Sequence, residues 1–246
     1  ELIAKIKDIA RRKHILMTRY QQRQFARLVK PIDDVAARAA KVKVGEAHYV
    51  PSSRKRQHPI GLVAIGASTG GPPALQQIIT QLPRNLPVGV VIAQHMPPMF
   101  TQSLAERLNS ASSLTVREAE NGERLEAGMV LISPGGRHLT VKRRGGQPYV
   151  NVSDEPSTTL YKPCVDVLFN SAADAYGGAT MAVVLTGMGS NGLSGMRLIK
   201  SKGGVVIAQN EQTCVVYGMP RAVIEAGITD HIAPIDSIAS EIASYF

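Results

Sequence analysis

Short apolar runs alternate with helix-like segments from Ile60 to the end of the chain. The apolar runs are continuous, which is typical of strands that are buried on both faces of a sheet. Helical patterns between the runs indicate crossover connections and therefore parallel strands. We predict an α/β fold, a doubly wound and mostly parallel sheet with helices on both faces. The pairs of strand and helix are IGLVAIGAS with PALQQIITQLP, VGVVIAQH with TQSLAERLN, MAVVLTGMG with LSGMRLIKSKGG, and GVVIAQ with MPRAVIEAG.

Residues 114–152 show a different pattern of apolar and polar residues from the rest of this region. The segments LTVREAE, MVLISPGG and HLTVKRRGGQPYV read as short strands that are joined by glycine-rich turns. Such turns connect antiparallel strands more readily than parallel ones. We therefore expect residues 114–152 to form a small antiparallel insertion or edge of the sheet.

The first 58 residues differ from the remainder in pattern and in charge. Residues 1–13 place apolar side chains at helical spacing and predict an amphipathic helix, whereas residues 14–58 are basic and show no strand signal. We interpret 1–58 as the end of an upstream helix followed by a basic linker, and 59–246 as the folded domain that would carry any functional site. Because the chain opens on Glu1 rather than Met, we expect it to be a fragment of a longer protein.

The excess positive charge of the chain lies in its first 58 residues. The net charge is +9, from 28 Lys and Arg against 19 Asp and Glu. Residues 1–58 hold 15 of the basic and 5 of the acidic residues, which leaves 13 basic and 14 acidic residues for 59–246. A nearly neutral domain argues against a nucleic-acid partner. With no apolar run near the roughly 20 residues of a membrane helix, no export signal and two cysteines, we expect a cytoplasmic protein without membrane insertion.

Three of the predicted strands are followed by polar residues. Ser68 follows VAIGA, His95 follows VVIAQ, and Asn191 follows VVLTGMGS. Open parallel sheets place their sites beyond the carboxyl ends of the strands, which share one edge. We therefore expect a serine, a histidine and an amide side chain to gather at one edge of the sheet.

Each of these residues, taken alone, also has a plain structural interpretation. The loop around Ser68, GASTGG, can hold a phosphate, expose a nucleophile or only turn the chain. It matches neither dinucleotide-binding nor P-loop patterns, nor the G-x-S-x-G turn of many hydrolases. A lone His95 is more often a satisfied polar residue, and Asn191 a local cap of the next helix.

Together, the three residues match the needs of nucleophilic acyl transfer. A serine hydroxyl is a weak nucleophile until a histidine takes its proton. The histidine needs a partner at its other ring nitrogen, which fixes its tautomer and stabilises the imidazolium. That partner is normally a carboxylate, whereas here the third strand end offers the amide of Asn191.

Several long motifs in order resemble one family. The segments IGASTGGPPAL, AQHMPPMFTQSLAERLN, YKPCVDVLF, LTGMGSNGLSGM and AQNEQTCVVYGMPRAVIEAG are similar to the catalytic domain of the chemotaxis protein-glutamate methylesterases, the CheB family. The resemblance implies a serine hydrolase that demethylates glutamate methyl esters, and usually deamidates certain glutamines, on the cytoplasmic helices of methylated chemoreceptors. It implies no metal and no organic cofactor. It also implies a response-regulator receiver domain upstream, which this chain lacks.

The resemblance also assigns roles to individual residues of the catalytic triad and its surroundings. Ser68 becomes the nucleophile and His95 the general base. Thr69 and Met188 line the site, with the backbone amide of Met188 as an oxyanion donor. The family's aspartate in G-M-G-x-D-G falls on position 191, where this chain has asparagine.

Asn191 leaves several alternatives open. Its side chain can present an oxygen to His95, which keeps the reactive tautomer, or an NH₂ group, which does not. The asparagine is an engineered inactivation, a natural weakly active variant, or a sign that another carboxylate orients His95. The candidate carboxylates are Asp166, Asp154, Glu211 and Asp230, and Asp166 also has a plain reading as a first-turn residue of a helix.

Two other classes of function compete with the esterase. One is a catalytically weak or inactive receptor-binding regulatory module of the same fold, which Asn191 favours. The other is a nucleotide- or phosphate-binding protein that uses the GASTGG loop, although it has no motif lysine or ribose-binding acidic residue. We predict a protein-glutamate methylesterase whose activity is attenuated by Asn191.

Overall fold

The structure, a computed structural model, describes residues 59–246 of the chain. The helix predicted for 1–13 and the linker predicted for 14–58 lie outside the described residues. Among the described residues, seven strands form one sheet in the order β3-β4-β2-β1-β7-β8-β9, and every neighbouring pair is parallel. The strands are β1 (Leu62–Ala67), β2 (Gly89–Gln94), β3 (Thr115–Glu118), β4 (Met129–Ile132), β7 (Thr180–Val184), β8 (Val205–Gln209) and β9 (His231–Ala233).

The centre of the sheet is the core of the domain. All residues of β1, β2, β7 and β8 are buried, in agreement with their continuous apolar sequences. Strand β1 lies between β2 and β7, and Ile65 of β1 is in register with Ile92 and Val183. Helices cover both faces of these strands, so that neither face meets water.

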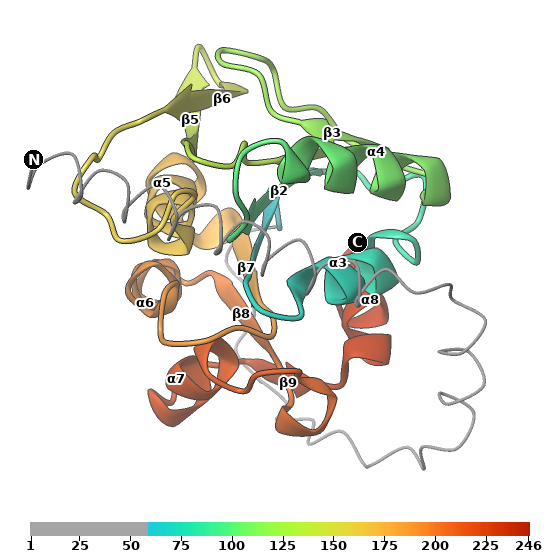
Figure 1. Cartoon of the computed structure of the whole chain (residues 1–246), viewed down its shortest axis with the longest axis vertical. Coiled ribbons are helices and arrows are strands. Elements are labelled where there is room, and N and C mark those ends of the chain that lie inside the picture. The colour runs from blue at the N-terminus through green and yellow to red at the C-terminus, as the bar shows by residue number, and fades with distance from the viewer. Residues whose placement is uncertain (1–58) are drawn as a thin grey trace, which may run out of the picture. The chain divides into compact units, whose positions relative to one another are not determined.

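Within residues 59–246, the α-helices α3 to α8 form the two outer layers, which can be followed in Figure 1. Helices α3, α4 and α8 pack on one another on one face, and α5, α6 and α7 do so on the other. Each has an apolar stripe, as in α3, which buries Leu75, Ile78 and Ile79. The helices are α3 (Gly71–Ile79), α4 (Phe100–Ala111), α5 (Val165–Tyr176), α6 (Leu193–Ser201), α7 (Met219–Glu225) and α8 (Ile235–Ala243).

The chain order makes the sheet doubly wound. From β1 the chain first builds outward through β2, and it later returns to the other side of β1 with β7, β8 and β9. A reversal of this kind creates a crevice at the carboxyl ends of the central strands, which is where open α/β sheets hold ligands. The reversal lies at β1, directly before Ser68. The predicted fold class is confirmed.

The prediction for residues 114–152 was wrong in part. Only β5 (His138–Arg144) and β6 (Gln147–Ser153) are antiparallel, and they form a separate two-stranded sheet that packs on α5. Strands β3 and β4 instead extend the main sheet in parallel. No helix joins them, and helices were the signal we used for parallel neighbours. The buried run MVLI of β4 is the sequence signal that fits a parallel strand.

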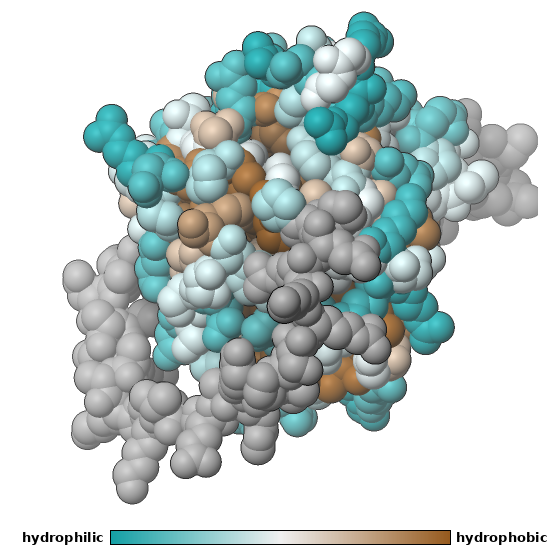
Figure 2. Space-filling view, turned by 180° about the vertical axis from the view of Figure 1, so that it is seen from behind, coloured by the Kyte–Doolittle hydropathy of each residue, from teal (hydrophilic) through white to brown (hydrophobic). Residues whose placement is uncertain are grey.

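Two elements near the C-terminus, β9 and α8, were not among the predicted strand and helix pairs. Strand β9 has only three residues, too few for a hydrophobic pattern to stand out. Where the described residues are visible in Figure 2, hydrophilic residues surround small, separate hydrophobic areas. None of the described helices has the length and apolar character needed to cross a bilayer.

Candidate active site

Ser68 lies in the turn between β1 and α3, at the sheet's carboxyl edge. Its backbone N–H donates to the carbonyl of Thr186, 3.0 Å away, which holds the turn against the loop after β7. The turn leaves room for glycine alone at position 71, because a Cβ atom there would overlap the side-chain oxygen of Gln94. The glycines of GASTGG therefore hold Ser68 close to the neighbouring strand ends.

His95 follows β2 and lies beside Ser68. Its Nδ1 atom is 3.1 Å from the Ser68 Oγ, and its Nε2 atom is 2.9 Å from the Asn191 Oδ1. The phenol ring of Tyr161 stacks on the imidazole with 4.4 Å between ring centroids and 14° between planes. The structure thus brings Ser68, His95 and Asn191, the three strand-end residues, into one hydrogen-bonded row.

The amide orientation of Asn191 follows from its other neighbours. Its Oδ1 also accepts from the backbone N–H of Val165, at 2.7 Å, and its Nδ2 donates to the Asp166 Oδ2, at 2.8 Å. A backbone N–H can only donate and a carboxylate can only accept, so the oxygen faces His95. Nε2 of His95 then carries the proton, and the lone pair of Nδ1 faces the Ser68 hydroxyl.

The interpretation of Asn191 as a local cap of the next helix is wrong. Gly192 is the N-cap of α6, and no side chain makes the capping bond there. The Asn191 side chain instead points to the first residue of α5, which is far away in sequence. It therefore links two helices to His95.

Burial and hydrogen bonding have opposite effects on the pKa of His95. Burial lowers the pKa below its ordinary value of 6.5, while the hydrogen bond to Asn191 and the charge of Asp166 raise it and offset part of this effect. The result is a lowered pKa. His95 is therefore a neutral base at neutral pH, as proton abstraction from a hydroxyl requires.

Thr69 and Met188 border the serine on its solvent side. The exposed Thr69 is held through its carbonyl, which accepts from the Thr186 Oγ1 at 2.9 Å. Met188 follows Gly187, where a Cβ atom would lie only 2.7 Å from the Cβ of Ser68. Among the described residues, no backbone carbonyl accepts the Met188 N–H. That N–H is therefore available to a ligand oxygen next to Ser68.

Of the four candidate carboxylates, Asp166 is the one that contacts Asn191 within the described residues. Asp154 pairs with Arg137, and Asp230 pairs with Lys200. Glu211 begins the short 3-10 helix η2 (Glu211–Thr213). Asp166 also lies in the first turn of α5, as its plain structural interpretation expects. A residue in that turn can still contact Asn191, so the two interpretations are compatible.

Sequence reasoning missed Gln94, the last residue of β2. Its Nε2 donates to the carbonyl of Ser68, at 2.9 Å, and to that of His95, at 3.1 Å. The side chain is buried, and it ties the serine turn to the histidine loop. A polar residue that closes a fully apolar strand was the available signal, because buried amides are kept for their hydrogen bonds.

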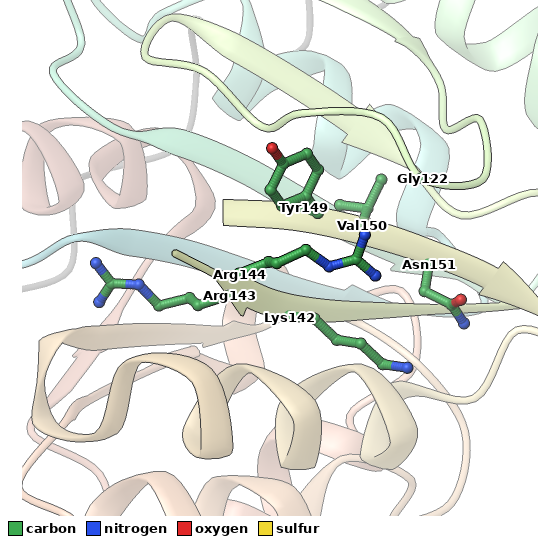
Figure 3. A pocket seen from close by; sticks show the side chains of 7 residues that line it. All are labelled: Gly122, Lys142, Arg143, Arg144, Tyr149, Val150 and Asn151. Atoms are coloured by element: carbon green, nitrogen blue, oxygen red, sulfur yellow. The ribbon is translucent and has the colours of Figure 1, made fainter. Parts of the chain in front are cut away.

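A hollow lies on the β5–β6 hairpin, and none of the predicted site residues lines it. It measures about 260 Å³, and basic and aromatic side chains line it (Figure 3). Its charged members are Lys142, Arg143 and Arg144, and Arg143 also lies over the ring of Tyr176. No serine or histidine lines it, so nothing in this hollow supplies a nucleophile with a base.

Fold and site together define a doubly wound α/β protein whose polar groups meet at the switch point of the sheet. The family model described as CheB methylesterase matches residues 63–242. The chain therefore belongs to the CheB methylesterase family, and the resemblance seen in the sequence is confirmed.

Individual relatives agree with this assignment. The chain is 54% identical over 187 residues to a protein-glutamate methylesterase/protein-glutamine glutaminase of Desulfitobacterium hafniense, a match that covers 76% of this chain and 48% of that protein. It is 50% identical over 183 residues to the protein of the same name from Lawsonia intracellularis, with 74% and 51% covered. The chain thus spans about half the length of these curated relatives.

A solved structure matches as well. The CheB methylesterase catalytic domain of Thermotoga maritima superimposes with a TM-score of 0.74 at 44% sequence identity. The match covers 77% of this chain and all of that one. Similarity therefore extends over the whole of that catalytic domain.

Proposed function

We propose that this chain is a protein-glutamate methylesterase, a serine hydrolase that cleaves glutamate methyl esters on chemoreceptors. The observation that carries the proposal is the row formed by the Ser68 hydroxyl, the His95 ring and the Asn191 oxygen, with contacts of 3.1 and 2.9 Å. Family membership supports the choice of ester and of receptor. The printed names of the relatives support glutamine deamidation as a second reaction of the same site.

The reaction begins with proton transfer. Nδ1 of His95 takes the hydroxyl proton of Ser68 while Oγ attacks the ester carbonyl carbon. The tetrahedral intermediate collapses by breaking the bond to the methoxy oxygen, and the imidazolium gives that oxygen its proton, so methanol leaves. Water then attacks the acyl-enzyme with His95 again as base. Ser68 regains its proton, and a glutamate carboxylate is released.

The backbone around Ser68 is suited to the negative oxygen of this intermediate. The Met188 N–H has no carbonyl partner among the described residues, and Gly187 holds it against Ser68. Helix α3 begins at Gly71, so its amino end also faces the turn. We assign Met188 N–H as an oxyanion donor, with Thr69 lining the other side.

The surroundings of Ser68 fit a protein substrate. Tyr161 stacks on His95, Met188 is 66% exposed, and Val215 packs against Gly70 while remaining 65% exposed. These side chains give the site an apolar rim. Large apolar side chains at the surface are typical of protein-binding sites. We propose that the rim contacts the receptor helix, and that an upstream receiver domain controls access to it.

Asn191 favours one alternative, a regulatory module that binds receptors with little or no turnover. An amide oxygen keeps the reactive tautomer of His95 but supplies no charge for the imidazolium. The two alternatives differ in whether methanol is released from a bound receptor.

The test is methanol release from a methylated receptor fragment by the chain and by Ser68→Ala. A fluorophosphonate that labels active serines is applied to the same proteins, with Ser103→Ala on the exposed side of α4 as the matched control. We expect turnover and labelling in the parent and in Ser103→Ala, and neither in Ser68→Ala. Equal labelling of Ser68→Ala would contradict the assigned nucleophile, and receptor binding without turnover would favour the regulatory module.

A further inference from the structure

We propose that Asp166 is a positioning residue of this site, which acts on His95 through the side chain of Asn191. The inference rests on the proposed function. It assigns to this chain a row of four groups, a carboxylate, an amide, an imidazole and a hydroxyl, in place of the usual three. The carboxylate is one hydrogen bond farther from the histidine than in a triad.

Asp166 is itself held firmly. Its Oδ2 accepts from the Asn191 Nδ2 at 2.8 Å, and its Oδ1 accepts from the backbone N–H of Gly195 at 2.9 Å. The residue lies in the first turn of α5, whereas Gly195 lies in α6. Both oxygens are occupied by partners from a second segment, so the carboxylate has a fixed position against Asn191.

This position locks the amide of Asn191. If the amide were turned over, its NH₂ group would face the N–H of Val165, and its oxygen would face the carboxylate of Asp166. Both contacts would then be repulsive, because donors would meet donors and acceptors would meet acceptors. The turned amide would also offer a donor to His95 Nε2, which selects the wrong tautomer for proton abstraction. Asp166 thereby maintains the reactive form of His95.

Asp166 also supplies the charge that Asn191 lacks. When His95 takes the proton of Ser68 it becomes a cation, and a carboxylate one side chain away stabilises it. The ionisable groups near His95 are Tyr161, which stacks on it, Cys164, which contacts the Asn191 Nδ2 at 3.2 Å, and Asp166. The charge of Asp166 raises the pKa of His95 against the larger effect of burial. Asp166 is the carboxylate of this set, and its charge is the one that acts on His95.

The first experiment compares Asp166→Ala and Asp166→Asn with the parent. The alanine variant removes both the lock and the charge, and the asparagine variant keeps one acceptor without the charge. We expect kcat to fall about ten- to hundredfold in Asp166→Ala, and less in Asp166→Asn, with KM unchanged. The acid limb of the pH–rate profile moves to lower pH in both. The matched control is Asp236→Asn, which alters an exposed first-turn carboxylate of α8.

A second experiment separates positioning from support of the fold. In the double variant Asn191→Asp/Asp166→Asn, the amide and the carboxylate exchange places. The carboxylate at 191 can accept from Val165 and His95, and the amide at 166 can donate to it while accepting from Gly195. We therefore expect Asp166→Asn to cost less than about twofold in kcat in the Asn191→Asp background. Equal costs in the two backgrounds would overturn the proposal.

The ring nitrogens of His95 provide a readout that does not depend on turnover. Nitrogen-15 NMR distinguishes a protonated from an unprotonated ring nitrogen, and we expect Nε2 to carry the proton in the parent. In Asp166→Ala the two tautomers become mixed. If the His95 signals and their titration are unchanged in Asp166→Ala, Asp166 is only a helix residue. If the parent and Ser68→Ala both release no methanol, the proposed esterase fails, while these signals still decide the role of Asp166.

Discussion

The sequence GVVIAQ occurs twice, at 89–94 as the whole of β2 and at 204–209 as Gly204 followed by β8. Both repeats end in a buried glutamine that ties loops together. Gln94 donates to the carbonyls of Ser68 and His95, and Gln209 accepts from the N–H of Thr186 and donates to the carbonyl of Thr213. The strands thus do the same structural work, one on each side of the central pair β1 and β7.

The residue that follows each repeat is different. His95 follows the first and lies between Ser68 and Asn191. Asn210 follows the second and caps η2, where its Oδ1 accepts from the N–H and the hydroxyl of Thr213. The same sequence therefore forms a buried strand with a glutamine that links two loops, once on each side of the sheet. Whether the strand end belongs to the candidate active site depends on the next residue, which is His95 in one case and Asn210 in the other.

The largest expected effect comes from replacing these two following residues. We expect His95→Ala to lower kcat by about 10⁴-fold or more, because Ser68 loses its base. Asn210→Ala should leave kcat within a few fold and lower the free energy of unfolding by about 1 kcal/mol, as for a lost helix cap. Initial rates of methanol release and urea unfolding measure both. Similar rates in the two variants would remove the contrast between the strand ends.

The substitution Asn191→Asp, at a third strand end, tests the same comparison by a gain in kcat instead of a loss. We expect kcat to rise about ten- to hundredfold, because a charge would then face the His95 imidazolium directly. The gain stays below the roughly 10⁴ that separates aspartate from asparagine in chymotrypsin-type triads, where the asparagine also selects the wrong tautomer. Asp166 would lie beside the new carboxylate, and the repulsion between the two negative charges limits the gain in kcat further. An unchanged kcat would mean that charge at position 191 plays no part.

The two glutamines allow a matched pair of substitutions with a smaller expected effect. Gln94→Leu and Gln209→Leu should each lower the free energy of unfolding by about 1–3 kcal/mol, because buried backbone groups lose a partner. Only Gln94→Leu should also lower kcat, by about tenfold, since Gln94 fixes both Ser68 and His95. Steady-state kinetics beside urea unfolding test this. If Gln209→Leu loses as much kcat, the two repeats do not differ in the way we describe.

The smallest expected effect is on pH dependence. The pKa of His95 is lowered from 6.5 by burial, so the acid limb of kcat/KM should have its midpoint below pH 6.5. The unfolded chain binds a proton at His95 more readily than the folded one. The corresponding stability is present above pH 6.5 and is lost as pH falls through the folded-state pKa. His95→Gln should lose this part of the pH dependence of unfolding, whereas Asn210→Ala should retain it.

The sheet and its strand ends were predictable because they depend on short-range pattern. Continuous apolar runs with helices between them indicate buried parallel strands, and their carboxyl ends share one edge. Ser68, His95 and Asn191 were therefore expected at the same place before any distance was known. Strands β3 and β4 escaped this logic because no helix connects them.

The details of the site depend on contacts between distant segments. Whether the Asn191 oxygen or nitrogen faces His95 is decided by Val165 and Asp166, about 25 residues earlier in the chain. No local pattern around position 191 contains that information. The role of Gln94 also became visible only once β1 lay beside β2, although its burial at a strand end was foreseeable.

Because Tyr161 stacks on His95, the fluorescence of this tyrosine can report the protonation of the histidine. The chain has seven tyrosines and no tryptophan, so tyrosine emission is not masked by a stronger fluorophore. When the imidazole gains its proton, the 4.4 Å stack becomes a cation–π pair, and the environment of the phenol changes. The fluorescence of Tyr161 should therefore follow the charge of His95 in the unlabelled protein, and Tyr161→Phe would remove that signal.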